Sequence, residues 1–211
     1  MVTRLELVLR RNLPSGVRHV LRLCRHLVRR SVASPPLPAH LINDCRLTAT
    51  RSDLVAALPG SGRIAEVGSY RGDFAKVILA RCQPCELHLI DLDFALLDPA
   101  LAADARVRRH TGQSFAMLAQ FPDDFFDWIY IDADHSFAGT TRDAHAAAPK
   151  VKPGGYLVFN DFAHVDPDLG AYGVHRAVVE FAIAQNWPFA WFAYDGSALY
   201  DVALRRPPPN P

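Results

Sequence analysis

The chain has 211 residues, of which half are hydrophobic and 21% are charged, a composition typical of an ordinary globular domain. This balance excludes a disordered, collagenous or disulfide-scaffold chain, and no apolar run reaches the ~18 residues that a membrane-spanning helix needs. The net charge of +1 argues against a dedicated nucleic-acid binder.

The N-terminal segment differs in charge from the rest of the chain. Residues 1–31 carry eight arginines and one acid, a net charge of +7, whereas the remainder has a net charge of −6. Over 17–30 the apolar residues fall on one face of a helix and the arginines on the other. This pattern predicts a helix that packs on the domain or on a second copy of the chain, as in a homodimer. A peripheral helix on an anionic membrane surface and an organellar transit peptide are the alternatives.

The proline-rich run at 34–38 predicts a linker. We therefore expect a basic N-terminal segment and linker over 1–40, one domain over 41–206, and a proline-rich tail over 207–211. The segment has no apolar core of the kind found in secretory signals, which predicts a cytoplasmic protein with reduced thiols. Cys82 and Cys85 form a C-x-x-C between a predicted helix and a predicted strand. A redox pair normally opens a helix instead, so we interpret both as small buried side chains.

Between linker and tail, short apolar runs alternate with helix-length stretches. A helix is expected over 52–58, with Ser52 as its N-cap and Pro59-Gly60 as its end. The expected strands are Ile64–Val67, Leu87–Ile90, Arg106–His110, Trp128–Ile131 and Tyr156–Phe159. The expected helices are Asp73–Arg81, Phe94–Ala103, Ser114–Gln120, Thr140–Ala148 and Val174–Asn186. The alternation predicts a parallel sheet with helices on both faces.

The last two strand-like runs, Phe189–Tyr194 and Ser197–Leu204, are joined by Asp195-Gly196. Asp-Gly is typical of a two-residue hairpin turn, and such a turn forces an antiparallel pair. The predicted fold class is therefore α/β: a doubly wound, mostly parallel, seven-stranded sheet with a C-terminal antiparallel hairpin strand and N-terminal helices.

The first strand continues into a glycine loop, Glu66–Gly72. Glycines after a first strand mark the nucleotide-binding corner of a doubly wound sheet. The dinucleotide fingerprint G-x-G-x-x-G is absent, because Glu66 stands where its first glycine would be. A carboxylate there repels a pyrophosphate and attracts a cation. The loop thus favours S-adenosylmethionine, which carries an ammonium and a sulfonium, over NAD; a plain turn without ligand is the alternative.

Polar residues also end the second and third strands. Asp91 lies about 20 residues past the glycine loop, where an acid accepts ribose hydroxyls. Asp93 is expected to help cap the following helix. Gln113 and Ser114 are placed to meet an adenine edge, with a plain N-cap as the alternative for Ser114.

The densest chemistry follows the fourth and fifth strands. Asp132, Asp134 and His135 end the fourth strand, and Asn160-Asp161 ends the fifth. Adjacent parallel strands lie about 4.8 Å apart, so Asp132 and Asp161 can share one cation, and with Asn160 they form an all-oxygen set that suits Mg²⁺. Such an ion lowers the pKa of a hydroxyl, and Asp134 or His135 would take the proton. The alternative is that the acids cap loops and the histidine is a structural hydrogen-bonding group.

Taken together, these motifs resemble the class I S-adenosylmethionine-dependent methyltransferases from about Leu47 to Leu204. The likeness is greatest to a subgroup of small O-methyltransferases acting on catechols and sugars. It rests on Ile131–Phe137, Lys152–Tyr156, Asn160-Asp161 and Tyr172–Val178. Two departures are a loop with fewer glycines than usual and Asn160 in place of an acid.

The resemblance implies a cofactor with its methionine part beside Glu66 and Gly68, its ribose on Asp91 and its adenine near Gln113 and Ser114. The expected cofactor-binding residues are Glu66, Gly68, Tyr70, Gly72, Asp91, Leu92, Gln113, Ser114 and Asp132. The expected catalytic residues are Asp134 and His135, and the expected metal ligands are Asp132, Asn160 and Asp161.

We therefore predict an enzyme, a methyltransferase that uses S-adenosylmethionine to methylate a hydroxyl oxygen of a small molecule, with Mg²⁺ or another divalent cation as an expected aid. A non-catalytic cofactor-binding or membrane-associated scaffold and an NAD-type oxidoreductase are the alternatives. N-methylation stays open. His164, Tyr172 and His175 follow the fifth strand and are candidates for lining the acceptor pocket.

Overall fold

A computed structural model of the chain describes residues 16–17, 33–166 and 170–208. The chain divides into two compact units, Met1–Ala33 and Ser34–Pro211, and the second contains every element discussed below. The amphipathic helix predicted over 17–30 lies, except for Val17, outside the described residues. Its contact with a membrane or with a second copy therefore stays a prediction.

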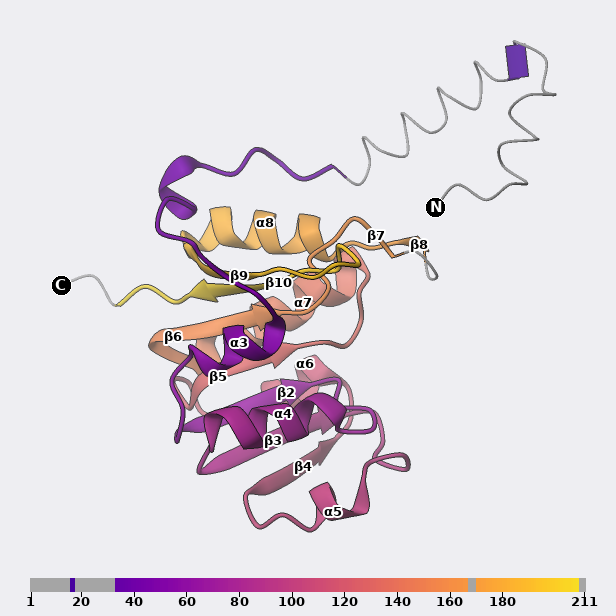
Figure 1. Ribbon diagram of the computed structural model, residues 1–211, viewed down its shortest axis with the longest axis vertical. Coiled ribbons are helices and arrows are strands. Elements are labelled where there is room, and N and C mark those ends of the chain that lie inside the picture. The colour runs from indigo at the N-terminus through magenta and orange to yellow at the C-terminus, as the bar shows by residue number, and fades with distance from the viewer. Residues whose placement is uncertain (1–15, 18–32, 167–169, 209–211) are drawn as a thin grey trace. The chain divides into compact units, whose positions relative to one another are not determined.

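Unit 34–211 is built on an eight-stranded sheet in the order β1-β9-β10-β6-β5-β2-β3-β4 (Figure 1). The strands are β1 (Arg46–Thr48), β2 (Arg63–Val67), β3 (Glu86–Asp91), β4 (Val107–Thr111), β5 (Phe126–Ile131), β6 (Val151–Phe159), β9 (Phe189–Ala193) and β10 (Asp201–Arg205). Neighbouring strands are parallel except where β10 pairs with β6 and β9. A separate pair, β7 (Val165–Asp166) and β8 (Gly170–Ala171), is antiparallel. The predicted α/β class, a doubly wound and mostly parallel sheet with a reversed C-terminal strand, is confirmed.

Two features of the sheet differ from the sequence prediction. The strand β1 pairs with β9 and adds an eighth strand to the seven that were predicted. The sequence did not indicate this strand, because three residues are too few to show the alternation of buried and exposed residues. The connection between β9 and β10 covers residues 194–200. The prediction of a two-residue turn at Asp195-Gly196 is therefore wrong, whereas the predicted antiparallel pairing is confirmed. Asp195 Oδ1 accepts a hydrogen bond from the Ser197 amide at 2.7 Å, and this local turn opens the wider loop.

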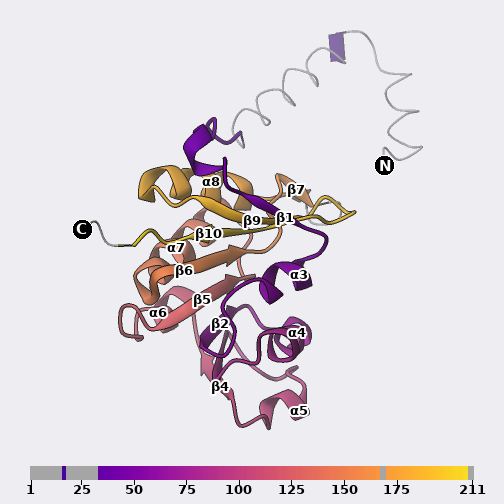
Figure 2. The same cartoon turned by 60° about the vertical axis from the view of Figure 1, so that its left-hand side comes forward.

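Helices cover both faces of the sheet (Figure 2). They are α3 (Arg51–Ala56), α4 (Asp73–Cys82), α5 (Pro99–Ala102), α6 (Ser114–Leu118), α7 (Phe137–Ala147) and α8 (Val174–Gln185), with short 3-10 turns at Ala39–Leu41 and Ala148–Lys150. Apolar residues of α6, α7 and α8 pack in one hydrophobic cluster, and those of α3, α4 and α5 pack in another. The central strand β5 contributes to both clusters, which explains its almost continuous apolar sequence.

Helix ends differ locally from the prediction. The N-cap of α3 is Thr50, whose side chain accepts a hydrogen bond from the Asp53 amide, and not Ser52. The helix expected from Phe94 shrinks to the single turn α5, which Asp98 caps at 2.8 Å. Ser114 is the first residue of α6 and not its cap.

The sequence also led to expectations about the cysteine side chains and about membrane-spanning helices. Cys82 is buried and donates to the Val55 carbonyl, whereas Cys85 is exposed, so the expectation of two buried thiols is right for Cys82 only. Within the described ranges, no helix is long and apolar enough to span a bilayer.

Candidate active site

A cavity of about 410 Å³ opens at the carboxyl ends of β2, β3, β4 and β5. The chain leaves β2 toward β3 on one side and later returns to β5 on the other, so this is the topological switch point where such sheets bind ligands. The cavity is lined by Gly68, Tyr70, Ile90, Asp91, Leu92, Gly112, Gln113, Ser114, Asp132, Ala133, Asp134 and Arg142. All of the expected cofactor-binding residues except Glu66 and Gly72 are among them.

Gly68 lets the glycine loop pass directly over the end of β5. Its φ is +88°, and a Cβ there would lie 1.9 Å from the Asp132 carbonyl oxygen. Only glycine fits such a contact in such a conformation. Gly72 also has a positive φ, but its missing Cβ makes room for Leu101 of α5, so its role in the structure is packing.

Asp91 is held at the cavity by the glycine loop itself. Its Oδ2 accepts a hydrogen bond from the Tyr70 amide at 2.7 Å, and its Oδ1 accepts one from the Leu92 amide at 2.6 Å. A carboxylate oxygen can accept a second hydrogen bond, so the side chain keeps capacity for ligand hydroxyls.

Glu66 lies in β2 and is buried beneath the cavity, with 2% of its surface exposed. Burial raises the pKa of its carboxyl group to about 8. Its Oε2 atom has no hydrogen-bond partner among the described residues. At neutral pH the group is therefore mostly uncharged, which corrects the expectation of a negatively charged carboxylate at this position.

At the far end of the cavity, Ser114 Oγ donates to Asp143 Oδ1 at 2.6 Å. Asp143 is fully buried in α7, and burial raises its pKa. Arg142 also lines the cavity and stacks over the Phe115 ring at 4.6 Å. Sequence reasoning missed both, because nothing local links a helix residue to the end of a distant strand.

The strand-end acids do come together around His135. Its Nε2 lies 3.4 Å from Asp132 Oδ1 and 3.6 Å from Asp161 Oδ2, and Tyr172 stacks on its ring at 4.7 Å. These are ion-pair distances, and Nε2 has no hydrogen-bond partner in the described part of the chain. Burial alone would lower the pKa of His135, but Asp132 and the other acids outweigh it, so the pKa is raised.

Asn160 is buried at the end of β6, and both the nitrogen and the oxygen of its amide are hydrogen-bonded. Its Nδ2 donates to Asp132 Oδ1 at 3.0 Å, and its Oδ1 accepts from Arg51 Nη1 at 3.3 Å. The same oxygen lies 3.1 Å from Tyr130 Oη, whose one hydrogen is shared between Asn160 and Asp201 Oδ2. The side chain thus turns a donor toward Asp132 and uses its oxygen elsewhere.

The predicted metal ligands Asp132, Asn160 and Asp161 do not fit a shared cation in this arrangement. The Asn160 oxygen is already occupied, and His135 lies between the two carboxylates. Over the ranges that the structure describes, no three His, Cys, Asp or Glu side chains are grouped as a metal site.

Asp134 lines the cavity but also supports the start of α7. Its Oδ1 accepts a hydrogen bond from the Ser136 amide at 2.9 Å, and Gly139 packs so tightly that a Cβ would lie 2.2 Å from the carboxyl carbon. The hydrogen bonds from Ser136 lower the pKa of Asp134, which makes it a weak base.

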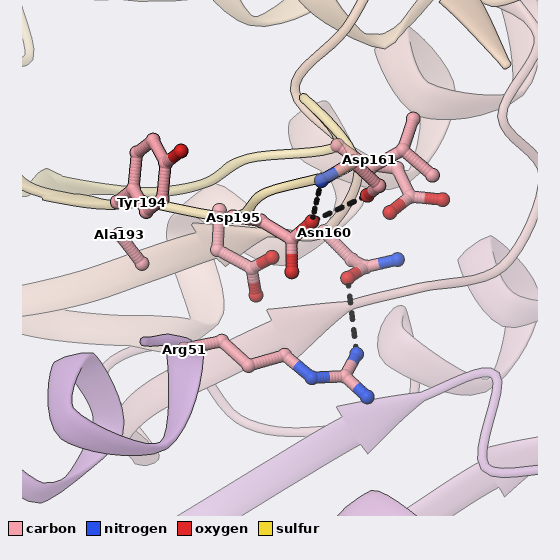
Figure 3. Close-up of a pocket in the computed structure, with 9 residues that line it drawn as sticks. Arg51, Asn160, Asp161, Ala193, Tyr194 and Asp195 are labelled. Atoms are coloured by element: carbon pink, nitrogen blue, oxygen red, sulfur yellow. Dashed lines mark hydrogen bonds between the residues drawn. The ribbon is translucent and has the colours of Figure 1, made fainter. Parts of the chain in front are cut away.

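A second cavity, of about 230 Å³, lies beside this cluster (Figure 3). It is lined by Arg51, Asn160, Asp161, Ala193, Tyr194, Asp195, Ser197, Leu199 and Asp201. The carboxyl group of Asp201 accepts a 2.5 Å hydrogen bond from buried Tyr130, and burial raises its pKa to about 7.

Of the residues expected near an acceptor pocket, His164 and His175 pack beside Phe162, and Tyr172 stacks on His135. His175 stacks on Phe162 with ring centroids 4.2 Å apart, and its ring lies 4.0 Å from that of His164 in a tilted arrangement. Its Nδ1 is 2.5 Å from Ser34 Oγ. With Tyr172, these histidines line neither of the two cavities.

Comparison with known proteins finds one family model and a set of solved structures that are similar to the chain. Residues 65–162, somewhat less than half of the chain, match a family model described as a methyltransferase domain. No curated protein sequence matches the chain.

Solved structures share the fold. An O-methyltransferase family protein from Burkholderia thailandensis is 15% identical with a TM-score of 0.58, and the match covers 75% of this chain and 56% of that one. An S-adenosylmethionine-dependent methyltransferase from Aquifex aeolicus is 13% identical with a TM-score of 0.57, covering 74% and 89%. The N-methyltransferase NodS from Bradyrhizobium japonicum, in complex with S-adenosylhomocysteine, is 14% identical with a TM-score of 0.56, covering 74% and 86%.

At these identities the likeness shows the fold, which is the Rossmann-like methyltransferase fold. The matched domain and this fold together support a class I S-adenosylmethionine-dependent methyltransferase.

Proposed function

We propose that the protein transfers a methyl group from S-adenosylmethionine to a hydroxyl oxygen of a small molecule. The observation that carries the proposal is the 410 Å³ cavity at the switch point. Asp91, the loop at Gly68 and Asp132 at the end of β5 all line this cavity. The matched methyltransferase domain covers the same segments, which disfavours the oxidoreductase and scaffold alternatives.

The residues present fit such a cofactor. Asp91 is held in place to accept ribose hydroxyls, and Gln113 and Ser114 line the end of the cavity proposed for adenine. The cavity has no phosphate-binding glycine motif, which agrees with a cofactor that lacks a pyrophosphate. When bound, the cofactor supplies a methyl group activated by a sulfonium.

The chain supplies a base next to that cavity. His135 Nε2 has no hydrogen-bond partner in the described part of the chain and faces the carboxylates of Asp132 and Asp161, which stabilise its protonated form. We propose that the acceptor hydroxyl gives its proton to His135, with Asp134 as the alternative base. The oxygen–carbon bond then forms as the carbon–sulfur bond breaks, and the thioether leaves with the bonding electron pair.

The acceptor atom is the finer part of the proposal. One structural neighbour is described as an O-methyltransferase family protein and another as an N-methyltransferase, so the neighbours do not decide between them. A base between two acids suits a neutral hydroxyl, which must lose a proton to become a good nucleophile. No divalent cation is part of the proposed step, because Asn160 Oδ1 is already bound by Tyr130 and Arg51.

Ligand-induced stabilisation tests the cofactor. S-adenosylmethionine and S-adenosylhomocysteine are expected to raise the melting temperature, since a ligand at a hundredfold excess over its Kd adds about 2.7 kcal/mol. NAD serves as the control and is expected to have no effect. Stabilisation by NAD alone, or by none of the three, would contradict the proposal.

Two substitutions then separate the bases, once screening for S-adenosylhomocysteine release has found an acceptor. His135→Gln is expected to lower kcat by ~10²–10⁴-fold with cofactor affinity little changed. If instead Asp134→Asn lowers kcat by this factor and His135→Gln keeps its activity, the base is Asp134.

A further inference from the structure

The second cavity contains a cation with unused hydrogen-bonding capacity. Arg51 extends from α3 toward Asn160 (Figure 3), and its Nη1 donates a long hydrogen bond of 3.3 Å to Asn160 Oδ1. Burial opposes the charge of this guanidinium, but the nearby Tyr130, Asp201 and Asp132 raise its pKa. The guanidinium stacks over the Phe74 ring at 4.5 Å. In the described part of the chain no carboxylate lies within 4.0 Å of it, so most of its five N–H donors have no protein partner.

The carboxylates that line this cavity, in contrast, already have partners. Asp201 accepts from Tyr130 at 2.5 Å, Asp195 accepts from the Ser197 amide at 2.7 Å, and Asp161 faces His135 at 3.6 Å. Burial also raises the pKa of Asp201 to about 7, which reduces its negative charge at neutral pH. Arg51 is thus the one cation among the residues that line the cavity, beside three aspartates, and its spare N–H donors are the capacity that a ligand could fill.

The position of the cavity connects it to methyl transfer. Asn160, which receives the Arg51 hydrogen bond, donates to Asp132 at 3.0 Å, and Asp132 lines the 410 Å³ cavity. The two cavities thus meet at the Asp132–Asn160 pair. A ligand group held by Arg51 would lie next to the site proposed for the methyl donor.

We propose that this second cavity is a carboxylate-binding subsite, in which the Arg51 guanidinium binds a carboxylate of a bound ligand. A planar guanidinium matches a carboxylate with two parallel N–H···O bonds, and Phe74 and Asn160 hold it in place for that contact. The inference rests on the proposed function, because the two ligands that could bring a carboxylate are the two substrates of methyl transfer. One is the methyl acceptor, and the other is the amino-acid end of the cofactor.

Calorimetric titration of the full chain distinguishes the sources. The cofactor arm compares S-adenosylhomocysteine with methylthioadenosine, which lacks the carboxylate. The acceptor arm compares benzoate with neutral benzyl alcohol, each titrated into free protein and into protein saturated with S-adenosylhomocysteine. Both arms use the wild type, Arg51→Met, Arg51→Lys and the control Arg46→Met. Arg46 also stacks over an aromatic ring, at 5.4 Å from Trp191, but lines neither cavity.

The two sources give different results. A carboxylate of the cofactor predicts that Arg51→Met weakens S-adenosylhomocysteine roughly ten- to a hundredfold and leaves methylthioadenosine unchanged. A carboxylate of the acceptor predicts unchanged S-adenosylhomocysteine binding and loss of the preference for benzoate over benzyl alcohol. In both cases Arg51→Lys is expected to be intermediate, because it keeps the charge but not the fork, and Arg46→Met is expected to match the wild type.

Folded Arg51→Met protein that binds both S-adenosylhomocysteine and benzoate like the wild type would overturn the subsite, as would a wild type with no preference for either carboxylate. If the wild type binds neither S-adenosylhomocysteine nor methylthioadenosine, the proposed cofactor is contradicted instead. The benzoate titration of the free protein would still test Arg51 in that case.

Discussion

Replacing Glu66 by glutamine isolates the cost of a buried carboxyl group beneath the proposed cofactor site. Glu66 lies in β2 between β3 and β5, is 2% exposed, and has an Oε2 atom without a partner among the described residues. Glutamine has nearly the same shape and does not ionise. The substitution therefore changes the charge that the site can take with little change in packing.

The magnitude follows from the two pKa values of Glu66. Its ordinary value is 4.5, and burial raises the pKa in the folded protein to about 8. Between these values the folded state keeps a proton that the unfolded state has lost, so the free energy of unfolding falls as pH rises. The slope approaches about 1.4 kcal/mol per pH unit, and the loss over the whole window is at most about 5 kcal/mol. The glutamine variant lacks this loss.

Urea unfolding of wild type and Glu66→Gln, measured at about pH 5, 6, 7, 8 and 9, gives the difference directly, because other titrating groups cancel. The stability of the variant relative to the wild type is expected to rise from about pH 5 to pH 8 and to level off above it. A difference that stays constant over this range would refute the reasoning, since it would mean that Glu66 ionises as it does in water.

Glu86→Gln provides a matched control on the neighbouring strand β3. Burial opposes the shift, but the hydrogen bond from Arg63 and the neighbouring His88 and Arg108 side chains lower the pKa of Glu86. The contribution of Glu86 to the free energy of unfolding is therefore fully present above the pKa of the unfolded state. It is lost only as pH falls through the lower pKa of the folded state. The stability lost in Glu86→Gln is expected to be independent of pH over the window in which Glu66→Gln changes.

Three further outcomes are expected. Asp91→Ala weakens S-adenosylhomocysteine ten- to a hundredfold, about 1.5–3 kcal/mol, in calorimetry, whereas Asp93→Ala, next to the cavity but not lining it, leaves the affinity unchanged. An unchanged affinity in folded Asp91→Ala would remove this residue from the site. Gly68→Ala loses about 1–3 kcal/mol of unfolding free energy or more, because its φ is +88° and its Cβ would lie 1.9 Å from a carbonyl oxygen of the facing loop. Wild-type stability in urea would contradict that contact. Methyl transfer persists in EDTA, because the Asn160 oxygen is bound by protein donors, and activity that returned only with added Mg²⁺ would contradict this reading of the cluster.

The order and type of the main elements could be predicted from the sequence, because local pattern decides them. The strand β5 is buried on both faces apart from Asp127 at its start, so its residues form an apolar run that is recognisable without its neighbours. Parallel strands end at the same edge of the sheet, and for this reason the sequence also predicted that Asp132 and Asp161 would lie close together. That His135 lies between them is seen only in the structure.

The tertiary structure decided what depends on partners far apart in the chain. Arg51 and Asn160 are 109 residues apart, and their contact follows from where α3 packs beside the sheet. That contact, together with the hydrogen bond from Tyr130, turns the Asn160 oxygen away from the position expected for a metal ligand. The three-residue strand β1 likewise exists only because β9 offers it an edge to pair with. Sequence periodicity records whether a residue is buried, whereas the direction of a polar side chain is set by the donors and acceptors that other elements bring to it.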